Sequence, residues 1–95
     1  MNCVHLVGHL ATDIDLRESD GNKVASSIIA VERNEYEADF FRLKCYGPFA
    51  ERFKEQAVGK GRRVAIRGKL RQDIYEKDGE ERKAVSVHVD EFELL

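Results

Sequence analysis

The sequence contains no Trp, one Pro, one Met and only two Cys among its 95 residues. Two cysteines are too few for a disulfide framework. Cys3 and Cys45 each fall in a strand-like stretch, which favours buried thiols in a reducing compartment. Together with His5, His9 and His88 they match no zinc-ligand spacing. The sequence therefore predicts no metal site.

Long apolar runs are also missing, because no stretch approaches the roughly 20 residues that a membrane-spanning helix requires. The N-terminus MNCVHLVGHL has neither a basic leader nor a small-residue cleavage site, so we expect no signal peptide. The chain is 42% hydrophobic and 36% charged and has no low-complexity tract. This composition is typical of one folded domain over residues 1–95 with no membrane partner.

Patterns for catalysis and cofactor binding are absent as well. Asp13 and Asp15 form a short acidic pair without partner residues, and Ser26 and Ser27 have no adjacent base motif. No glycine-rich loop suited to cradling a phosphate occurs. We therefore expect a protein that is not an enzyme and binds no cofactor.

Charge is distributed unevenly along the chain. The formal net charge is −2. The segment KGRRVAIRGKLR, from Lys60 to Arg71, nevertheless holds six basic residues and no acidic one. The stretch from Glu32 to Asp39 contains four acidic residues and one Arg. This separation predicts a basic stripe that the net charge hides.

Alternation of apolar and polar side chains predicts five strands. They span residues 4–10, 23–33, 39–46, 62–77 and 83–95. Residues 11–22 are interpreted as a connection that ends in the turn signal DGN. Gly8, inside the first strand, indicates a bend or bulge. The Asp-Gly pair in KDGEER predicts a hairpin turn between the last two strands.

The segment GPFAERFKEQAVGKG predicts a single helix. Gly47 and Pro48 suit its N-cap and first helical position. Phe49, Phe53 and Ala57 recur at i, i+4 and i+8 and form one apolar stripe. One of the two glycines in VGKG is expected to end the helix.

The predicted order β-β-β-α-β-β matches the OB-fold, a five-stranded Greek-key barrel. The helix would then close the open end of the barrel with its phenylalanines. OB-folds bind oligonucleotides on the face of their second and third strands. The third predicted strand is therefore the first place to look for a binding surface.

The third predicted strand, DFFRLKCYG, sends alternate side chains to opposite faces. Phe41, Leu43 and Cys45 are expected in the core. The opposite face carries Phe40, Arg42, Lys44 and Tyr46, which we call the aromatic–basic face. In the fourth strand, one face is expected to carry Val64, Ile66, Gly68, Leu70 and Ile74. In the last strand, Val85, Val87 and Val89 are expected to alternate with Ser86, His88 and Asp90.

The aromatic–basic face suits single-stranded nucleic acid, which offers unstacked bases and a charged backbone. Aromatic rings can stack on bases while Arg and Lys meet phosphates, so binding should weaken steeply with salt. Residues of the neighbouring strands and loop could extend this face. The candidate DNA-binding residues are Arg33, Tyr36, Phe40, Arg42, Lys44, Tyr46, Arg67, Lys69, Arg71 and Tyr75.

A protein–protein interface is the alternative reading of the exposed aromatics Phe40 and Tyr46, because such rings also mark interfaces. Their basic neighbours favour DNA. Tyr36 has the weakest case of the candidate rings, since Glu35 and Glu37 beside it would repel phosphate.

The sequence resembles the bacterial single-stranded DNA-binding protein family over nearly its whole length. The matching segments are NCVHLVGHLATDIDLR, GNKVASSIIAVER, FFRLKCYGPFAE, KGRRVAIRGKLR and VSVHVDEFELL, in that order. The resemblance implies an OB-fold in the bacterial cytoplasm, associated with the nucleoid. It also implies sequence-nonspecific binding of single-stranded DNA in replication, recombination or repair.

The resemblance further implies a homo-oligomer, with a tetramer favoured and a dimer possible. Phe40, Tyr46 and Tyr75 fall at or near aromatic positions where the family stacks bases, and Tyr36 lies close to a further one. Basic positions of the family pattern fall on Arg42, Lys60 and Arg71, which adds Lys60 to the candidate residues.

This chain departs from the family pattern at two main points. It lacks Trp, so its stacking surfaces are smaller, and it ends at Leu95 without the family's flexible, acidic-tipped C-terminal tail. The missing tail indicates either a trimmed protein or a naturally tail-less relative of the family. A related OB-fold module that holds protein partners in a replication-restart complex is the alternative function. An RNA-binding OB-fold is not separated from these, since no residue pattern reports on the 2′-hydroxyl.

Overall fold

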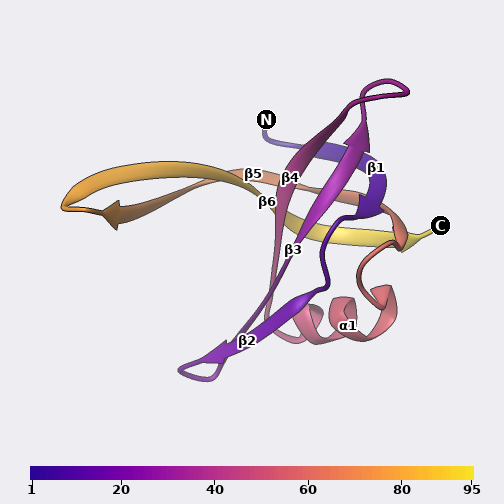
Figure 1. Ribbon diagram of the computed structural model, residues 1–95. Coiled ribbons are helices and arrows are strands. Elements are labelled where there is room, and N and C mark those ends of the chain that lie inside the picture. Colours follow the sequence, from indigo (N-terminus) through magenta and orange to yellow (C-terminus); the bar gives the residue numbers. More distant parts are fainter.

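Six strands and one helix make up the chain in a computed structural model that describes all residues 1–95 (Figure 1). The elements are β1 (Val4–Leu10), β2 (Asp15–Ser19), β3 (Asn22–Glu32), β4 (Ala38–Tyr46), α1 (Pro48–Ala57), β5 (Arg63–Lys77) and β6 (Glu80–Leu94). The only helix is too short and too polar to span a membrane. The predicted helix and all five predicted strands are therefore present, with one strand more.

The strands form one sheet in the order β1-β5-β6-β4-β3-β2, and an additional pairing joins β1 to β3. That pairing makes a closed circuit of five strands, β1-β5-β6-β4-β3, in which only β4 and β6 run parallel. Closure removes exposed sheet edges from most of the structure. The arrangement is the predicted OB-fold.

The additional strand, β2, corrects the prediction that residues 11–22 are only a connection. β2 pairs along its whole length with the first part of β3, and Asp20 and Gly21 turn the chain with positive φ angles of 51° and 79°. Nearly all of its side chains are exposed, and Leu16 alone packs on the core. The apolar alternation that reveals a half-buried strand was therefore absent.

Helix α1 packs against β2, β3 and β4 and covers one end of the barrel (Figure 1). Its apolar stripe is confirmed, because Phe53 and Ala57 are fully buried and Phe49 packs against the core cluster. The rings of Phe49 and Phe53 lie 5.5 and 5.1 Å from that of Phe92 in edge-to-face geometry. The predicted N-cap Gly47, with Pro48 at the first turn, is confirmed.

The helix ends before either of the two glycines predicted to end it, Gly59 and Gly61. Val58, and not Gly59 or Gly61, takes the left-handed C-cap conformation, with a φ of 65°. The two glycines follow with φ angles of 110° and 91°, so they carry the tight path from α1 to β5. Gly59 is packed against Asp13, whose Oδ1 accepts a hydrogen bond of 3.0 Å from the backbone N–H of Lys60.

The second half of β5 and the first half of β6 leave the barrel as a two-stranded arm (Figure 1). Val64, Ile66 and Gly68 are buried as predicted. Leu70 and Ile74, however, are exposed, and Ile74 retains 63% of its accessible surface. Their predicted core face is wrong, because nothing in the chain covers this side of the arm.

A bulge between the barrel and the arm changes the register of β6. Arg67 pairs with Glu91 and Gly68 with Val89, which leaves Asp90 without a partner residue. A Cβ on Gly68 would lie 2.2 Å from the backbone oxygen of His88, so only glycine allows this close approach. Beyond the bulge, Val85 is exposed and its neighbour Ser86 is buried, so the predicted alternation of β6 fails there.

Two further predictions of burial are wrong in the single chain. Phe41 is 39% exposed, because the barrel core under β4 begins only at Leu43 and Cys45. The thiol of Cys3 is exposed, because Cys3 precedes β1 and lies outside the barrel. The thiol of Cys45 is buried as predicted, and this burial raises its pKa to about 12.

Candidate nucleic-acid interface

The aromatic–basic face lies on the outside of β4, as the alternation predicted. The side chain of Phe40 is 64% exposed, Tyr46 and Arg42 are also exposed, and Lys44 is half-buried. Across the β3–β4 ladder these residues lie opposite small or aliphatic residues of β3, such as Ala30 opposite Phe40. The rings of Phe40 and Tyr46 therefore project beyond the shorter side chains of β3, which leaves their faces accessible to a flat ligand.

Arg42 borders a shallow hollow on this face. The hollow has a volume of about 390 Å³ and lies between β3, β4 and the β1–β2 connection. Its walls include Thr12 and Ser27, whose hydroxyl oxygens are 3.1 Å apart. Arg42 forms no ion pair, so its guanidinium is available to an anion.

A second hollow brings Tyr46 together with Lys69 and Arg71 of β5. It also has a volume of about 390 Å³, and His88 and Asp90 of β6 contribute to its lining. The rings of Tyr46 and His88 lie 5.0 Å apart and are tilted by 47°. Neither Lys69 nor Arg71 forms an ion pair. This hollow therefore combines an aromatic wall with two available cations.

His88 is a residue of this surface that the sequence did not single out. Pairing of β6 with β4 and β5 places it between Lys44 and Lys69 in one row across the sheet. Its Nε2 is shut off from solvent and has no hydrogen-bond partner. Burial lowers the pKa of His88 below 6.5, and the charges of Arg71 and Lys44 act in the same direction, while Asp73 opposes them. Only the pairing of distant strands shows this placement.

Lys44 is held by a carboxylate of β5. Its Nζ lies 3.2 Å from Oδ2 of Asp73, and the same oxygen accepts a hydrogen bond of 2.8 Å from the hydroxyl of Ser86. Desolvation acts to raise the pKa of Asp73, but the hydrogen bonds from Ser86 and Lys44 outweigh it and lower that pKa below 3.8. Asp73 is therefore an anion in neutral solution.

Arg33 and Tyr36 lie at the far end of the face, where β3 turns into β4. The guanidinium of Arg33 pairs with Glu37 at 3.2 Å and with Asp39 at 2.5 Å, and its hydrogen bond to Asp39 raises its pKa. Tyr36 projects from the loop with 91% of its surface exposed. The acidic loop thus neutralises its own arginine.

Arg67, Lys60 and Tyr75 lie apart from the two hollows. Arg67 pairs with Glu91 at 2.8 Å beside His5 of β1, and its hydrogen bond to Glu91 raises its pKa. Lys60 is exposed in the loop between α1 and β5, and Tyr75 is partly exposed on the arm. The structure therefore brings five candidate residues together at the two hollows, and the others lie elsewhere on the molecule. The five are Arg42, Lys44, Tyr46, Lys69 and Arg71.

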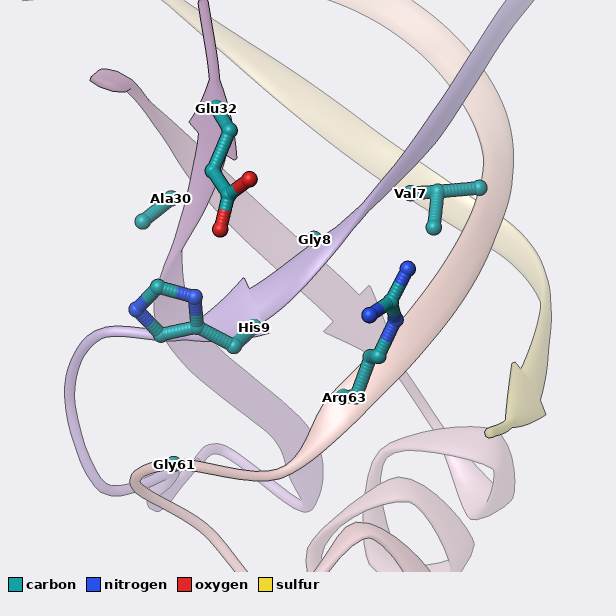
Figure 2. A pocket seen from close by; sticks show the side chains of 7 residues that line it. All are labelled: Val7, Gly8, His9, Ala30, Glu32, Gly61 and Arg63. Carbon is teal, nitrogen blue, oxygen red and sulfur yellow. The ribbon is translucent and has the colours of Figure 1, made fainter. Parts of the chain in front are cut away.

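A third hollow, of about 360 Å³, opens where β1 and β3 separate beyond their short pairing (Figure 2). The side chains of His9, Glu32 and Arg63 surround Gly8 there. A Cβ on Gly8 would lie 2.1 Å from the backbone oxygen of Ala30, so this crossing requires glycine. None of the candidate DNA-binding residues lines this hollow.

No group of three or more His, Cys, Asp or Glu side chains is placed to hold a metal ion. Near the N-terminus, the Sγ of Cys3 lies 3.2 Å from Nε2 of His5. Two donors do not complete a zinc site. The two hollows of the candidate surface combine rings, cations and hydroxyl groups with single carboxylates such as those of Asp13, Asp15 and Asp90.

The amino-acid sequence matches a known protein family and several of its members. The sequence model described as "Single-strand binding protein family" matches residues 1–95. A single-stranded DNA-binding protein of Clostridium perfringens is 36% identical over all of this chain and 66% of its own length. Proteins of the same description from Staphylococcus epidermidis and Treponema pallidum are 28% and 30% identical over the whole chain. The chain spans 76% and 58% of their respective lengths.

Proposed function

Because the chain belongs to the single-strand binding protein family over residues 1–95, we propose that it binds single-stranded DNA without sequence preference. It acts in DNA replication, recombination or repair, as a protein that coats DNA and catalyses no reaction. The observation that carries this proposal is the exposed aromatic–basic face of β4, which lies where OB-folds receive oligonucleotides.

Bases stack on the exposed rings of this face. Phe40 and Tyr46 lie six residues apart on β4 and therefore about 20 Å apart along the strand, a spacing of several nucleotides. Tyr75 on the arm and Tyr36 on the β3–β4 loop offer further rings at the two extremes. Stacking tolerates any sequence because every base has a π-face.

Phosphates are held first by the cations without an acidic partner, Arg42, Lys69 and Arg71. Two of these line the hollow beside Tyr46, so a base on that ring can have its phosphate neutralised nearby. Lys60 adds a further exposed cation. Lys44, Arg33 and Arg67 are each paired with a carboxylate and contribute only if the DNA displaces it.

A fluorescence anisotropy titration with labelled oligo-dT at two salt concentrations tests this function. We expect binding that weakens steeply with salt, because each neutralised phosphate on a single strand changes the slope of log K against log[salt] by about −0.7. Absent or salt-insensitive binding would refute the mechanism. The same titration with oligo-U measures the preference for DNA over RNA.

We propose that the protein works as a homo-oligomer, with a tetramer favoured over a dimer. Support comes from exposed apolar side chains away from the aromatic–basic face, on the arm and at the start of the β4 core face. They include Phe41, Leu70, Ile74 and Val85. Phe41 and Val85 occupy corresponding places, each two residues from the paired Leu43 and Val87. We place this assembly in the bacterial cytoplasm with the nucleoid, since the relatives named above are bacterial proteins.

A protein-interaction module of a replication-restart complex is the second candidate function. The acidic β3–β4 loop favours it, since Glu35 and Glu37 flank the most exposed ring and would repel a phosphate. If this candidate were correct, substitution of the rings on β4 would leave any binding of oligo-dT unchanged.

A further inference from the structure

One carboxylate lies in the middle of the proposed DNA path. Asp73 of β5 accepts hydrogen bonds from Nζ of Lys44 on β4, at 3.2 Å, and from the hydroxyl of Ser86 on β6, at 2.8 Å. Both donors bind the same oxygen, Oδ2. Three strands therefore meet at a single anionic atom.

The surroundings of this carboxylate favour negative charge. Lys44 and His88 interact electrostatically with Asp73, and Arg71 is two residues away on the same strand. Ser86 is 1% exposed, so its hydroxyl holds the carboxylate of Asp73 from the buried side. The ammonium group of Lys44 is the kind of donor that binds a phosphate oxygen in DNA.

This ion pair differs from the others among the candidate residues. The side chains of Lys44 and Asp73 are each 30% exposed, whereas those of Arg33 and Glu37 are each about 60% exposed. Solvent and salt screen the Lys44–Asp73 pair less. A phosphate that approaches Lys44 must therefore contend with a partly sheltered anion already in place.

We infer that Lys44 is a phosphate subsite that Asp73 neutralises, so that Asp73 is an internal competitor of the DNA backbone. The inference rests on the proposed function, because it assigns a role within the same surface. Asp73 limits the affinity for single-stranded DNA and keeps Lys44 from contributing to its salt dependence. It is a regulating residue of the surface and contacts no base.

The variant Asp73→Asn tests the inference, because Asn keeps the shape and an oxygen acceptor for Ser86 but removes the charge. In oligo-dT titrations between 50 and 200 mM salt, we expect Asp73→Asn to bind more tightly than wild type. The slope of log K against log[salt] should steepen by about 0.7, which is one additional phosphate. The advantage over wild type should then grow about 2.6-fold between the higher and the lower salt concentration.

Glu76→Gln is the matched control, because it removes one negative charge from the same strand at a residue without an ion pair. It should leave the slope unchanged. A slope for Asp73→Asn equal to that of Glu76→Gln would overturn the inference. So would weaker binding by Asp73→Asn at an unchanged thermal unfolding midpoint, since Asp73 would then position Lys44 for DNA.

A double-mutant cycle adds a second readout. Lys44→Gln should cost little affinity in the wild-type background and more in the Asp73→Asn background, because only there is Lys44 released to the phosphate. Equal losses in the two backgrounds would contradict competition at this subsite.

Inorganic phosphate separates this inference from the proposed function. Titration of wild type and Asp73→Asn with phosphate, followed by the NMR shift of the Ser86 amide, should give a saturable change in the variant only. A wild type that fails to bind oligo-dT would refute the proposed function, whatever the phosphate result. No phosphate response in a folded Asp73→Asn would refute the subsite itself.

Discussion

At the residue scale, strand parity decides which side chains of β4 can work on DNA. Leu43 and Cys45 are buried, whereas Phe40 on the opposite face is 64% exposed. Phe41 shares the face of Leu43 and Cys45, so the two neighbouring phenylalanines have different surroundings. The difference between Phe40 and Phe41 is smaller than alternation alone suggests, because Phe41 remains 39% exposed in the single chain. Exposure at Phe40 makes it the sharpest single-residue test of base stacking.

Phe40→Ala should weaken oligo-dT binding by about 1–3 kcal/mol, the general scale for one stacked base in single-strand-binding OB-folds. The thermal unfolding midpoint should change little, since most of the ring is in solvent. Anisotropy titration and thermal unfolding together measure both effects. Phe40→Tyr keeps a stacking ring and should retain affinity. Unfolding of Phe40→Ala would instead mean that the ring supports the core.

His88 should make stability depend on pH. Its pKa in the folded chain is lowered below 6.5 by burial, so the unfolded state binds more protons between the folded value and 6.5. The free energy of unfolding is therefore highest above pH 6.5 and falls as the pH drops through that window. Asp73, with a pKa lowered below 3.8, affects stability only at more acidic pH, where its contribution is lost.

Urea unfolding of wild type and His88→Asn between pH 5 and pH 8 measures this dependence. We expect the variant to lose stability less steeply than wild type as the pH falls from 7 to 5. Identical profiles for the two proteins would show that the imidazole of His88 is not responsible.

At the scale of elements, α1 is the structural support of the barrel. Phe53 is fully buried, and the centroid of its ring lies 5.1 Å from that of Phe92 in β6. Phe53 is therefore the main contact between the helix and the barrel. The helix has only ten residues, and helices of that length depend on tertiary packing for their stability. Loss of this contact should therefore affect the whole domain.

Phe53→Ala should lower the free energy of unfolding by about 3–5 kcal/mol, the range for truncating a buried Phe. Chemical denaturation monitored by circular dichroism measures the loss. Phe49→Ala is the matched control, because Phe49 is only half-buried on the same stripe and should cost less. Equal costs at the two positions would contradict the packing described for α1.

At the scale of the whole molecule, the closed circuit of five strands leaves the β5–β6 arm outside. The side of the arm that carries Leu70, Ile74 and Val85 is apolar and uncovered in the single chain. Contiguous apolar surface of this kind marks an interface in a stable protein. The proposed homo-oligomer would cover it.

Ile74→Glu should therefore shift the protein toward smaller species, because a charge at an apolar contact is costly to desolvate. Light scattering coupled to size-exclusion chromatography measures the mass. Gln56→Glu on α1 adds the same charge at an exposed residue away from the arm and should leave the mass unchanged. An unchanged mass for Ile74→Glu would place the interface elsewhere.

Local periodicity in the sequence was enough to predict five of the six strands, the helix and the chemistry of the candidate face. Alternation located the strands, the spacing of Phe49, Phe53 and Ala57 located the helix, and both are set by local periodicity. The same periodicity separated Phe40 from Leu43 and Cys45. The order of the elements then led to the OB-fold, because few arrangements bury such a set of faces.

Which residues of distant strands meet depends on the closed sheet and could not be predicted from periodicity. β2 was missed because its exposed side chains carry no apolar signal, and Leu70, Ile74 and Val85 were misplaced because alternation does not reveal where a strand leaves the barrel. The meeting of Lys44, Asp73, Ser86 and His88 depends on the register of three strands and on the bulge at Gly68. Register is a property of the closed sheet, in which every ladder must fit its neighbours at once.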